Sequence, residues 1–218
     1  MELLKNGLIL CGIPENMLEN VSGKMDKYIK EIILFNSAYN LTNTSEYDEL
    51  VIRHVLDSLA AYKELETLVA EFSSAAPVFA DIGSGGGLPG IPLATVFPQF
   101  QFKLVERMSK RCAFLENCAA ILGLNNVEVI NSEAEKVASE SFDIAVFRAF
   151  RPLDEKMAST LLKMIKKDGY LAAYKARLDN IHEEMDSIKK LIPDYKVKKL
   201  NVPGLEDSER NLVIVRKN

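Results

Sequence analysis

The 218-residue sequence lacks the features of several protein classes. It has three cysteines, Cys11, Cys112 and Cys118, and no pair has CxxC spacing. This argues against a disulfide framework or a zinc site, so we expect no bound metal. No apolar run approaches the roughly 18 residues that a membrane span needs. The N-terminus lacks the basic start and small-residue cleavage site of a signal peptide. We therefore expect a cytoplasmic protein with no membrane partner.

A general excess of basic residues is also missing, since the net charge is −4. Charge is unevenly distributed, however. Residues 1–76 carry 6 Lys/Arg and 12 Asp/Glu, a net of −6, whereas residues 161–218 carry 13 and 9, a net of +4. A locally basic face on an acidic protein is compatible with selective binding of a polyanion. Charge alone slightly favours an ordinary solvated surface.

The pattern of apolar residues changes near Pro77. Before it, apolar residues recur at spacings of three and four over 15–68, which predicts helices, with Thr44 or Ser45 as one N-cap. After it, short apolar strands alternate with helices. The predicted strands are 78–82, 102–106, 127–131, 142–149, 170–176, 195–203 and 210–218. The clearest predicted helices are 109–123, from an N-cap at Ser109 to a stop at Gly123, 153–169, which ends at Gly169, and 180–192.

This alternation predicts an α/β fold with a doubly wound, mostly parallel sheet and helices on both faces. The last two strands have no helix between them, which predicts one antiparallel strand. We expect an N-terminal helical region at 1–72, an α/β domain at 73–218, and a linker at 73–77.

The stretch "DIGSGGGLPGIP", residues 81–92, contains five glycines and two prolines. In a doubly wound sheet, ligands bind beyond the carboxyl ends of the strands, where this loop is expected. The dinucleotide motif G-x-G-x-x-G fails because Leu88 replaces its third glycine, and no P-loop motif is present. The spacing of Asp81, Gly83, Gly85 and Gly87 instead resembles the first motif of S-adenosylmethionine-dependent methyltransferases. There, glycines let the backbone approach the cofactor.

Two charged residues are expected near this loop. Glu106 ends the second predicted strand, 23 residues after Gly83, where a carboxylate can accept hydrogen bonds from ribose hydroxyls. The alternative is an exposed carboxylate paired with Arg107 or Lys110. Arg148, at the end of the fourth strand, is a candidate for contact with the cofactor, the target base or its phosphate. The alternative is an ion pair with a local acid.

Four segments together resemble the RsmG/GidB family of bacterial small-subunit ribosomal RNA (guanine-N7) methyltransferases. They are "FNSAYNLTNTSEYDELVIRHVLDSLAAY", residues 81–135, "FDIAVFRAF" and "ERNLVIVRK". The resemblance implies a class I methyltransferase fold with a small N-terminal helical part, and S-adenosylmethionine as cofactor. It implies methylation of N7 of guanine 527, in the 530 loop of 16S rRNA. The partner would be 16S rRNA or the 30S subunit, and the protein would be a monomer.

The resemblance also carries cofactor positions onto this chain, namely Gly83, Leu88, Ala134, Glu135 and Arg148. With Asp81, Gly85 and Glu106 these form the predicted cofactor site. The family often has Lys-Gly after the fifth strand, whereas this chain has Lys175-Ala176, which puts that local contact in doubt.

Guanine N7 already carries an in-plane lone pair, so its methylation requires orientation and electrostatic stabilisation but no general base. Arg148 and Lys175 are the catalytic candidates, and His54 with Asp57 is expected to be a structural polar pair. The candidate RNA-phosphate contacts are Arg107, Arg111, Arg151, Lys175 and Arg210. No RNA-recognition motif is evident, so the substrate assignment rests on the resemblance. Two alternatives stay open: a nucleotide-dependent oxidoreductase, and a non-catalytic RNA- or protein-binding module on the same fold.

Overall fold

The computed structural model describes residues 1–72, 76–148 and 153–218. Part of the predicted linker at 73–77 lies outside the described residues, as do Ala149, Phe150 and Arg151. Within the described ranges, no helix combines the length and the apolar character needed to cross a membrane.

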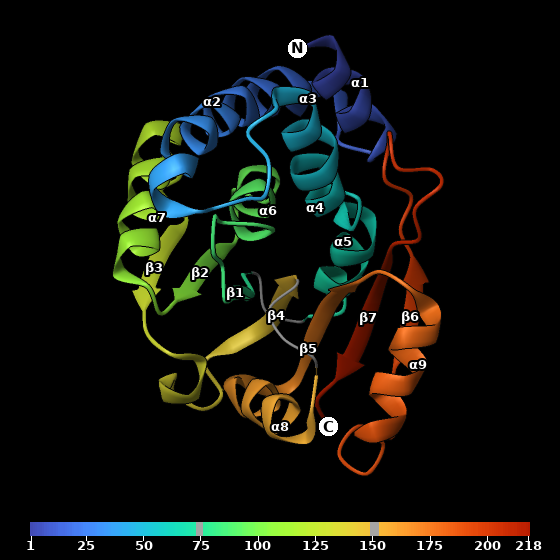
Figure 1. The fold of residues 1–218 in the computed structure, drawn as a ribbon. Coiled ribbons are helices and arrows are strands. Elements are labelled where there is room, and N and C mark those ends of the chain that lie inside the picture. The colour runs from blue at the N-terminus through green and yellow to red at the C-terminus, as the bar shows by residue number, and fades with distance from the viewer. Residues whose placement is uncertain (73–75, 149–152) are drawn as a thin grey trace.

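A seven-stranded sheet forms the centre of the molecule (Figure 1), in the order β3-β2-β1-β4-β5-β7-β6. Strands β1 to β5 are parallel to one another, whereas β7 runs antiparallel to both β5 and β6. The strands are β1 Val78–Ile82, β2 Gln101–Glu106, β3 Val127–Asn131, β4 Phe142–Arg148, β5 Ile165–Lys175, β6 Lys196–Lys199 and β7 Asn211–Arg216. The predicted α/β fold with one reversed strand is confirmed.

Helices cover both faces of the sheet (Figure 1), the N-terminal helices with α6 and α7 on one face, and α8 and α9 on the other. Side-chain alternation along the strands supplies each face with apolar residues: Phe79 of β1 joins one buried cluster, and Ala80 and Ile82 the other. The helices are α1 Glu2–Leu10, α2 Glu15–Tyr39, α3 Tyr47–Leu50, α4 Asp57–Leu59, α5 Tyr62–Ala70, α6 Gly90–Val96, α7 Ser109–Leu122, α8 Glu155–Met164 and α9 Leu178–Ser187. A π-helical segment, Val51–Leu56, joins α3 to α4.

The N-terminal helices pack directly on the sheet. Leu8 of α1 and Ile29 of α2 belong to the same buried cluster as Phe79 and Phe102 of the central strands. The segments that follow α2 are therefore held at a fixed place beside the sheet.

Two predicted helix caps are wrong. Helix α3 begins at Tyr47 after Glu46, so neither Thr44 nor Ser45 caps it. Ser109 is the first residue of α7 and Met108 precedes it as the N-cap, because the Ser109 hydroxyl donates to Asn131 Oδ1 (2.9 Å) instead. The predicted stop at Gly123 is confirmed, since Gly123 is the left-handed C-cap of α7 with φ 60°.

The predicted helix 153–169 is too long, because β5 begins at Ile165. Ile165 pairs with Phe142 and Tyr170 pairs with Ile144, so residues 166–169 form a bulge. A Cβ on Gly169 would lie 2.6 Å from the carbonyl oxygen of Asp143. This glycine therefore permits a close backbone approach within the sheet and does not end a helix. The last helix and the last two strands are also shorter than predicted.

Candidate active site

The glycine loop after β1 is fixed to its surroundings by hydrogen bonds. The backbone N–H groups of Gly83 and Ser84 donate to the carbonyl oxygen of Val105 in β2 (2.9 and 3.1 Å). The N–H of Gly85 donates to Glu106 Oε2 (2.9 Å). On the other side, the Tyr28 hydroxyl of α2 donates to the Gly86 carbonyl oxygen (2.5 Å). The loop is therefore held between the second strand and the N-terminal region.

The glycines of this loop serve different purposes. A Cβ on Gly87 would lie 2.6 Å from Ile91 Cγ1, and one on Gly90 would lie 2.4 Å from Leu104 Cδ2. These two glycines are needed for internal packing. Gly85 has φ 58°, and the nearest atoms to its Cβ position are 3.8 Å away or more. Of these three glycines, Gly85 is the one whose Cβ position would meet only ordinary van der Waals contacts.

A first cavity of about 560 Å³ opens beside Gly83, between the ends of β2 and β3. Its volume lies within the range of small-molecule sites. The lining residues are Gly83, Val105, Glu106, Arg107, Met108, Arg111, Ser132, Glu133, Ala134 and Glu135. The structure thus brings together four of the predicted cofactor residues, Gly83, Glu106, Ala134 and Glu135.

Glu106 is buried at the floor of this cavity, with 5% of its surface exposed. Its two oxygens accept hydrogen bonds from the backbone N–H groups of Gly85 (2.9 Å) and Met108 (2.8 Å). A carboxylate has about four acceptor positions, so Glu106 retains capacity for a ligand hydroxyl. The alternative of an exposed carboxylate paired with Arg107 or Lys110 is not what the structure has.

Asp81 and Leu88 are buried behind the loop and do not line the first cavity. Asp81 Oδ2 accepts the N–H of Gly90 at the start of α6 (2.9 Å), while Oδ1 is buried with no partner in the described residues. Burial raises the pKa of Asp81 to about 7, although the Gly90 hydrogen bond and Arg148 act in the opposite direction. Leu88 belongs to the hydrophobic cluster under the N-terminal helices. Both residues support the loop from behind.

Arg111, predicted as an RNA contact, lies in the first cavity next to the glycine loop. Its Nη2 donates to the Asn40 carbonyl oxygen (2.9 Å), and its Nε is buried without a partner in the described residues. Asn36 organises the segment that carries Asn40, because its Oδ1 accepts the N–H groups of Leu41 and Thr42 (2.9 Å each). Residues 40–42 are thereby brought against the glycine loop, where Leu41 lies next to Gly86.

A second cavity of about 430 Å³ lies where β4, β5 and β7 meet the N-terminal region. It contains Arg148, Lys175 and Arg210 of the predicted site, together with residues that the prediction did not include. The lining residues are Arg53, His54, Asp57, Arg148, Tyr174, Lys175, Ala176, Leu200, Arg210 and Asn211. Arg148 therefore lies with the predicted RNA residues and does not line the first cavity.

Arg148 is held by the N-terminal region. Its Nη1 forms an ion pair with Asp57 Oδ2 (2.6 Å), and Arg210 Nε pairs with Asp57 Oδ1 (3.1 Å). The Nη2 of Arg148 lies 3.2 Å from His54 Nδ1. Burial and the nearby Arg148 charge lower the pKa of His54 to about 4, so His54 is neutral at pH 7. His54 and Asp57, which were expected to form a polar pair, thus both contact Arg148.

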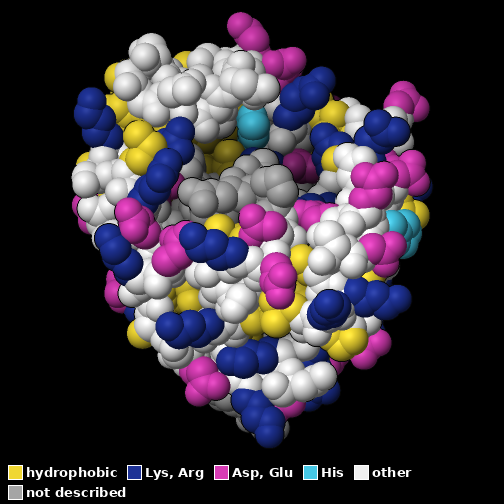
Figure 2. All heavy atoms as spheres, turned by 60° about the horizontal axis from the view of Figure 1, so that its bottom comes forward, with side chains coloured by type: hydrophobic (Ala, Val, Ile, Leu, Met, Phe, Trp, Pro, Cys, Tyr) yellow, Lys and Arg dark blue, Asp and Glu magenta, His cyan; other side chains and the backbone are white. Residues whose placement is uncertain are grey.

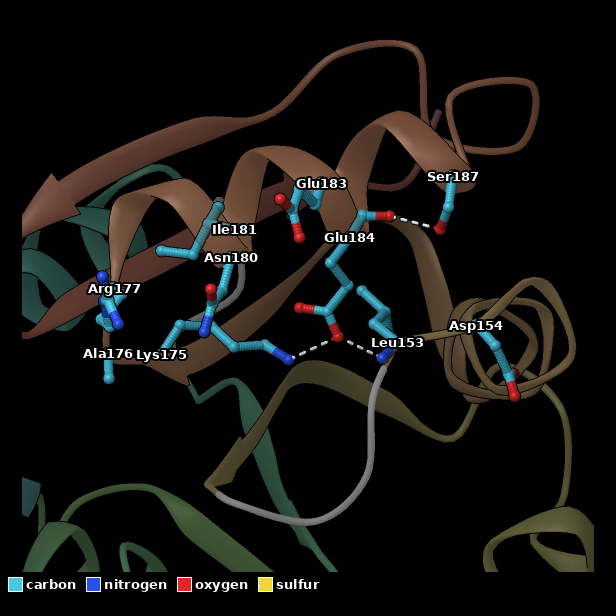
Figure 3. Close-up of a pocket in the computed structure, with 10 residues that line it drawn as sticks. All are labelled: Leu153, Asp154, Lys175, Ala176, Arg177, Asn180, Ile181, Glu183, Glu184 and Ser187. Carbon is cyan, nitrogen blue, oxygen red and sulfur yellow. Dashed lines mark hydrogen bonds and ion pairs between the residues drawn. The ribbon is translucent and has the colours of Figure 1, made fainter.

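Lys175 also borders a third, open cavity of about 530 Å³ next to α9 (Figure 3). Its ammonium forms an ion pair with Glu184 Oε1 (2.8 Å), and the same oxygen accepts the N–H of Leu153. Lys175 Nζ lies 5.5 Å from the centre of the Phe147 ring. Glu184 therefore ties the end of β5 to Leu153, which precedes the N-cap of α8.

On the face of the molecule seen in Figure 2, basic and acidic side chains are interspersed and do not form one continuous basic patch. A polyanion on this face would therefore contact local groups of cations. Within residues 1–72, 76–148 and 153–218, no cluster of His, Cys, Asp or Glu is arranged to hold a metal.

Comparison with solved structures defines the class of the fold. A Methanococcus maripaludis protein assigned as an S-adenosyl-L-methionine-dependent methyltransferase matches 88% of this chain and 93% of its own, with a TM-score of 0.61 and 14% identity. An Aquifex aeolicus SAM-dependent methyltransferase matches 72% of this chain and 89% of its own, with a TM-score of 0.52 and 16% identity. The chain has the fold of S-adenosylmethionine-dependent methyltransferases.

The family follows from the sequence. Residues 22–213 match the model of the GidB family, rRNA small subunit methyltransferase G. The ribosomal RNA small subunit methyltransferase G of Treponema denticola is 40% identical over 99% of this chain and 96% of its own length, and that of Neisseria meningitidis serogroup C is 33% identical over 99% and 98%. The chain belongs to this family. It is an S-adenosylmethionine-dependent rRNA methyltransferase, which decides against the oxidoreductase and the non-catalytic module.

The first cavity fits this cofactor chemically. Glu106 supplies acceptor capacity for hydroxyl groups, and the cavity reaches the backbone at Gly83. The guanidinium of Arg111, which lines the same cavity, supplies hydrogen-bond donors. An adenosyl group with a charged amino-acid portion needs donors and acceptors of this kind at one site.

Proposed function

We propose that this enzyme methylates N7 of guanine 527 in the 530 loop of 16S rRNA, with free 16S rRNA or the 30S subunit as substrate. Membership of the small-subunit rRNA methyltransferase family supports the choice of RNA. We also propose that the enzyme acts as a monomer in the cytoplasm, the compartment in which a bacterial rRNA is made.

The observation that carries the proposal is the gathering of four cationic side chains around the second cavity. Arg53, Arg148, Lys175 and Arg210 come from the N-terminal region and from the ends of three strands. Arginine and lysine in such a group bind RNA phosphates, which supply affinity, while the folded target loop supplies specificity. Arg111 and Arg107 flank the neighbouring first cavity and extend the basic character toward the glycine loop.

S-adenosylmethionine, when bound, supplies an electrophilic methyl group. The backbone at Gly83 and Gly85, the Glu106 carboxylate, and the Ala134–Glu135 turn would hold it in the first cavity, with Asp81 and Leu88 supporting the loop. In the parallel pairing of β1 with β4, Asp81 lies opposite Val146, so Arg148 ends β4 beside the start of the glycine loop, and it also lines the second cavity. We therefore assign Arg148 to the boundary between cofactor and RNA.

The chain's own residues need to orient the guanine and do not need to remove a proton. Guanine N7 attacks through a lone pair that it already has, so positioning and electrostatics lower the barrier. His54 and Asp57 are both engaged with Arg148 and serve to hold it. Lys175, held by Glu184, is the second residue placed to contact the substrate from the end of β5.

Methyl transfer from labelled S-adenosylmethionine to 30S subunits and to free 16S rRNA, both prepared without this modification, tests the proposal. The methylated position is mapped by strand cleavage specific for N7-methylguanine. We expect label at guanine 527 and none in RNA with adenine at that position. Transfer to another guanine, or to an atom other than N7, would contradict the proposal, and the two substrate forms show which one the enzyme prefers.

A further inference from the structure

Asp57 is the one carboxylate lining the second cavity among the described residues, and it holds two of the four cations there. Its side chain is 8% exposed. Oδ2 accepts Arg148 Nη1 at 2.6 Å and Oδ1 accepts Arg210 Nε at 3.1 Å. A single buried side chain thus ties the end of β4 to the residue that precedes β7.

Residues just before Asp57 in the chain also contact Arg148. Besides the ion pair, Arg148 Nη1 donates to the Arg53 carbonyl oxygen (3.2 Å), and Nη2 lies 3.2 Å from His54 Nδ1. Because a guanidinium only donates, His54 Nδ1 is the acceptor in that contact. The π-helical segment that carries Arg53 and His54 ends directly before Asp57. Isolated π-helical turns of this kind recur at functional sites.

The position of Asp57 is itself fixed by its neighbours. The Ser58 hydroxyl donates to the His54 carbonyl oxygen (2.6 Å), and the Tyr174 hydroxyl of β5 donates to the Ser58 carbonyl oxygen (2.8 Å). Asp57 therefore cannot move without disturbing β5, next to Lys175. A carboxylate held in this way sets where both guanidinium groups lie.

We propose that Asp57 is a positioning residue that couples the two binding sites: it holds Arg148 at the cofactor boundary and Arg210 for the rRNA, and it touches neither ligand. The rRNA half of this inference rests on the proposed function. Without the carboxylate, two guanidiniums share one partly buried cavity with no compensating charge and repel each other. Both arginines would then leave their binding positions, so one substitution would weaken the binding of two different ligands.

The test is Asp57→Asn, which keeps the size of the side chain and removes its charge. S-adenosylmethionine binding is measured by calorimetry, and 16S rRNA binding is measured by filter retention at fixed salt. We expect both dissociation constants to rise by at least about tenfold, which corresponds to the loss of a charge-assisted contact. Arg210→Gln is expected to weaken rRNA binding alone.

The matched control is Asp143→Asn. Asp143 is another largely buried carboxylate with two donors, Lys166 Nζ (2.9 Å) and the N–H of Val78 (2.8 Å), but it lies at the opposite end of β4. This variant is expected to lose stability and to leave both dissociation constants within about twofold of wild type. If Asp57→Asn does not fold, Asp57→Glu takes its place. It keeps the charge but displaces the carboxylate by one methylene, so both dissociation constants are still expected to rise, by less than in Asp57→Asn.

A folded Asp57 variant that binds both ligands within twofold of wild type would overturn the proposal. Weaker binding of only one of the two ligands would overturn the proposed coupling between the two sites. Wild-type protein that binds S-adenosylmethionine but not 16S rRNA would count against the proposed function. The effect of Asp57→Asn on S-adenosylmethionine binding would still test the role of Asp57 in holding Arg148.

Discussion

The two cavities at the carboxyl edge of the sheet are built in different ways. The first consists of one loop, two strand ends and the turn after β3, and backbone hydrogen bonds hold most of it in place. The second consists of side chains from four distant parts of the chain, held together by ion pairs around Asp57. The first is therefore a local structure with a sequence motif, whereas the second exists only because the N-terminal region packs on the sheet.

The largest effect is expected behind the glycine loop, as a dependence of stability on pH through Asp81. Burial raises the pKa of Asp81 from 3.8 to about 7 in the folded protein. The folded state then binds the proton more tightly than the unfolded state, so the contribution of Asp81 to stability is complete below pH 4 and is lost as the pH rises from 4 through 7. Relative to Asp81→Asn, wild type should lose about 4 kcal/mol over this window.

Urea unfolding of the two proteins at pH 4.5, 6 and 7.5 checks this expectation, because the difference between them isolates Asp81 from the other titrating groups. Parallel stability profiles would mean that Asp81 ionises normally and does not govern the loop.

The glycines of the loop differ in how much room an added Cβ would have, and we propose that Gly85 faces the cofactor. An added Cβ at Gly90 would lie 2.6 Å from Asp81 Oδ2, whereas one at Gly85 would lie at least 3.8 Å from its nearest neighbours. We expect Gly90→Ala to cost about 3 kcal/mol through overpacking. Gly85→Ala should cost about 1 kcal/mol, for its left-handed φ, and should weaken S-adenosylmethionine binding. Thermal unfolding and calorimetry measure both effects, and equal losses of stability would contradict the division.

A smaller effect is expected at the contact between the N-terminal region and the loop. Tyr28→Phe removes the hydroxyl that donates to the Gly86 carbonyl oxygen and leaves that oxygen without its buried partner. The expected loss in the free energy of unfolding is about 2 kcal/mol, and cofactor binding should be modestly weaker. Tyr62→Phe, whose hydroxyl contacts Glu66 of the same helix, is the control and should change cofactor binding by less than twofold. Equal effects of the two changes on cofactor binding would argue that α2 does not support the loop.

Four of the eight predicted cofactor residues line the first cavity, because its parts are close in the chain or follow from strand order. The glycine loop, Glu106 at a strand end, and the Ala134–Glu135 turn all converge as parallel topology requires. The roles of individual residues within the glycine loop could not be predicted from the sequence. Gly87 and Gly90 are needed for packing, and Leu88 is buried, because contacts with α7 and β2 decide those positions.

The second cavity could not be assembled from the sequence. The ion pair between Arg148 and Asp57 joins residues 91 positions apart, and that between Arg210 and Asp57 joins residues 153 apart. No local pattern encodes such pairs. The spacing of His54 and Asp57 indicated a polar pair on one helical face, but not its arginine partners. The boundary between α8 and β5 was missed for a similar reason, because pairing with β4 outweighs the helical pattern up to Gly169.

The most direct test of the division between cofactor and RNA cavities compares Glu106→Gln with Lys175→Gln. Each protein is titrated with S-adenosylmethionine, and with 16S rRNA over a range of salt concentrations. Glu106→Gln should weaken the binding of S-adenosylmethionine at least about tenfold and leave the affinity for rRNA unchanged. Lys175→Gln should leave the affinity for S-adenosylmethionine unchanged and weaken the binding of rRNA. The salt dependence of rRNA binding should fall by about one phosphate contact. The reverse pattern, or equal losses of both ligands in both variants, would contradict the assignment of one ligand to each cavity.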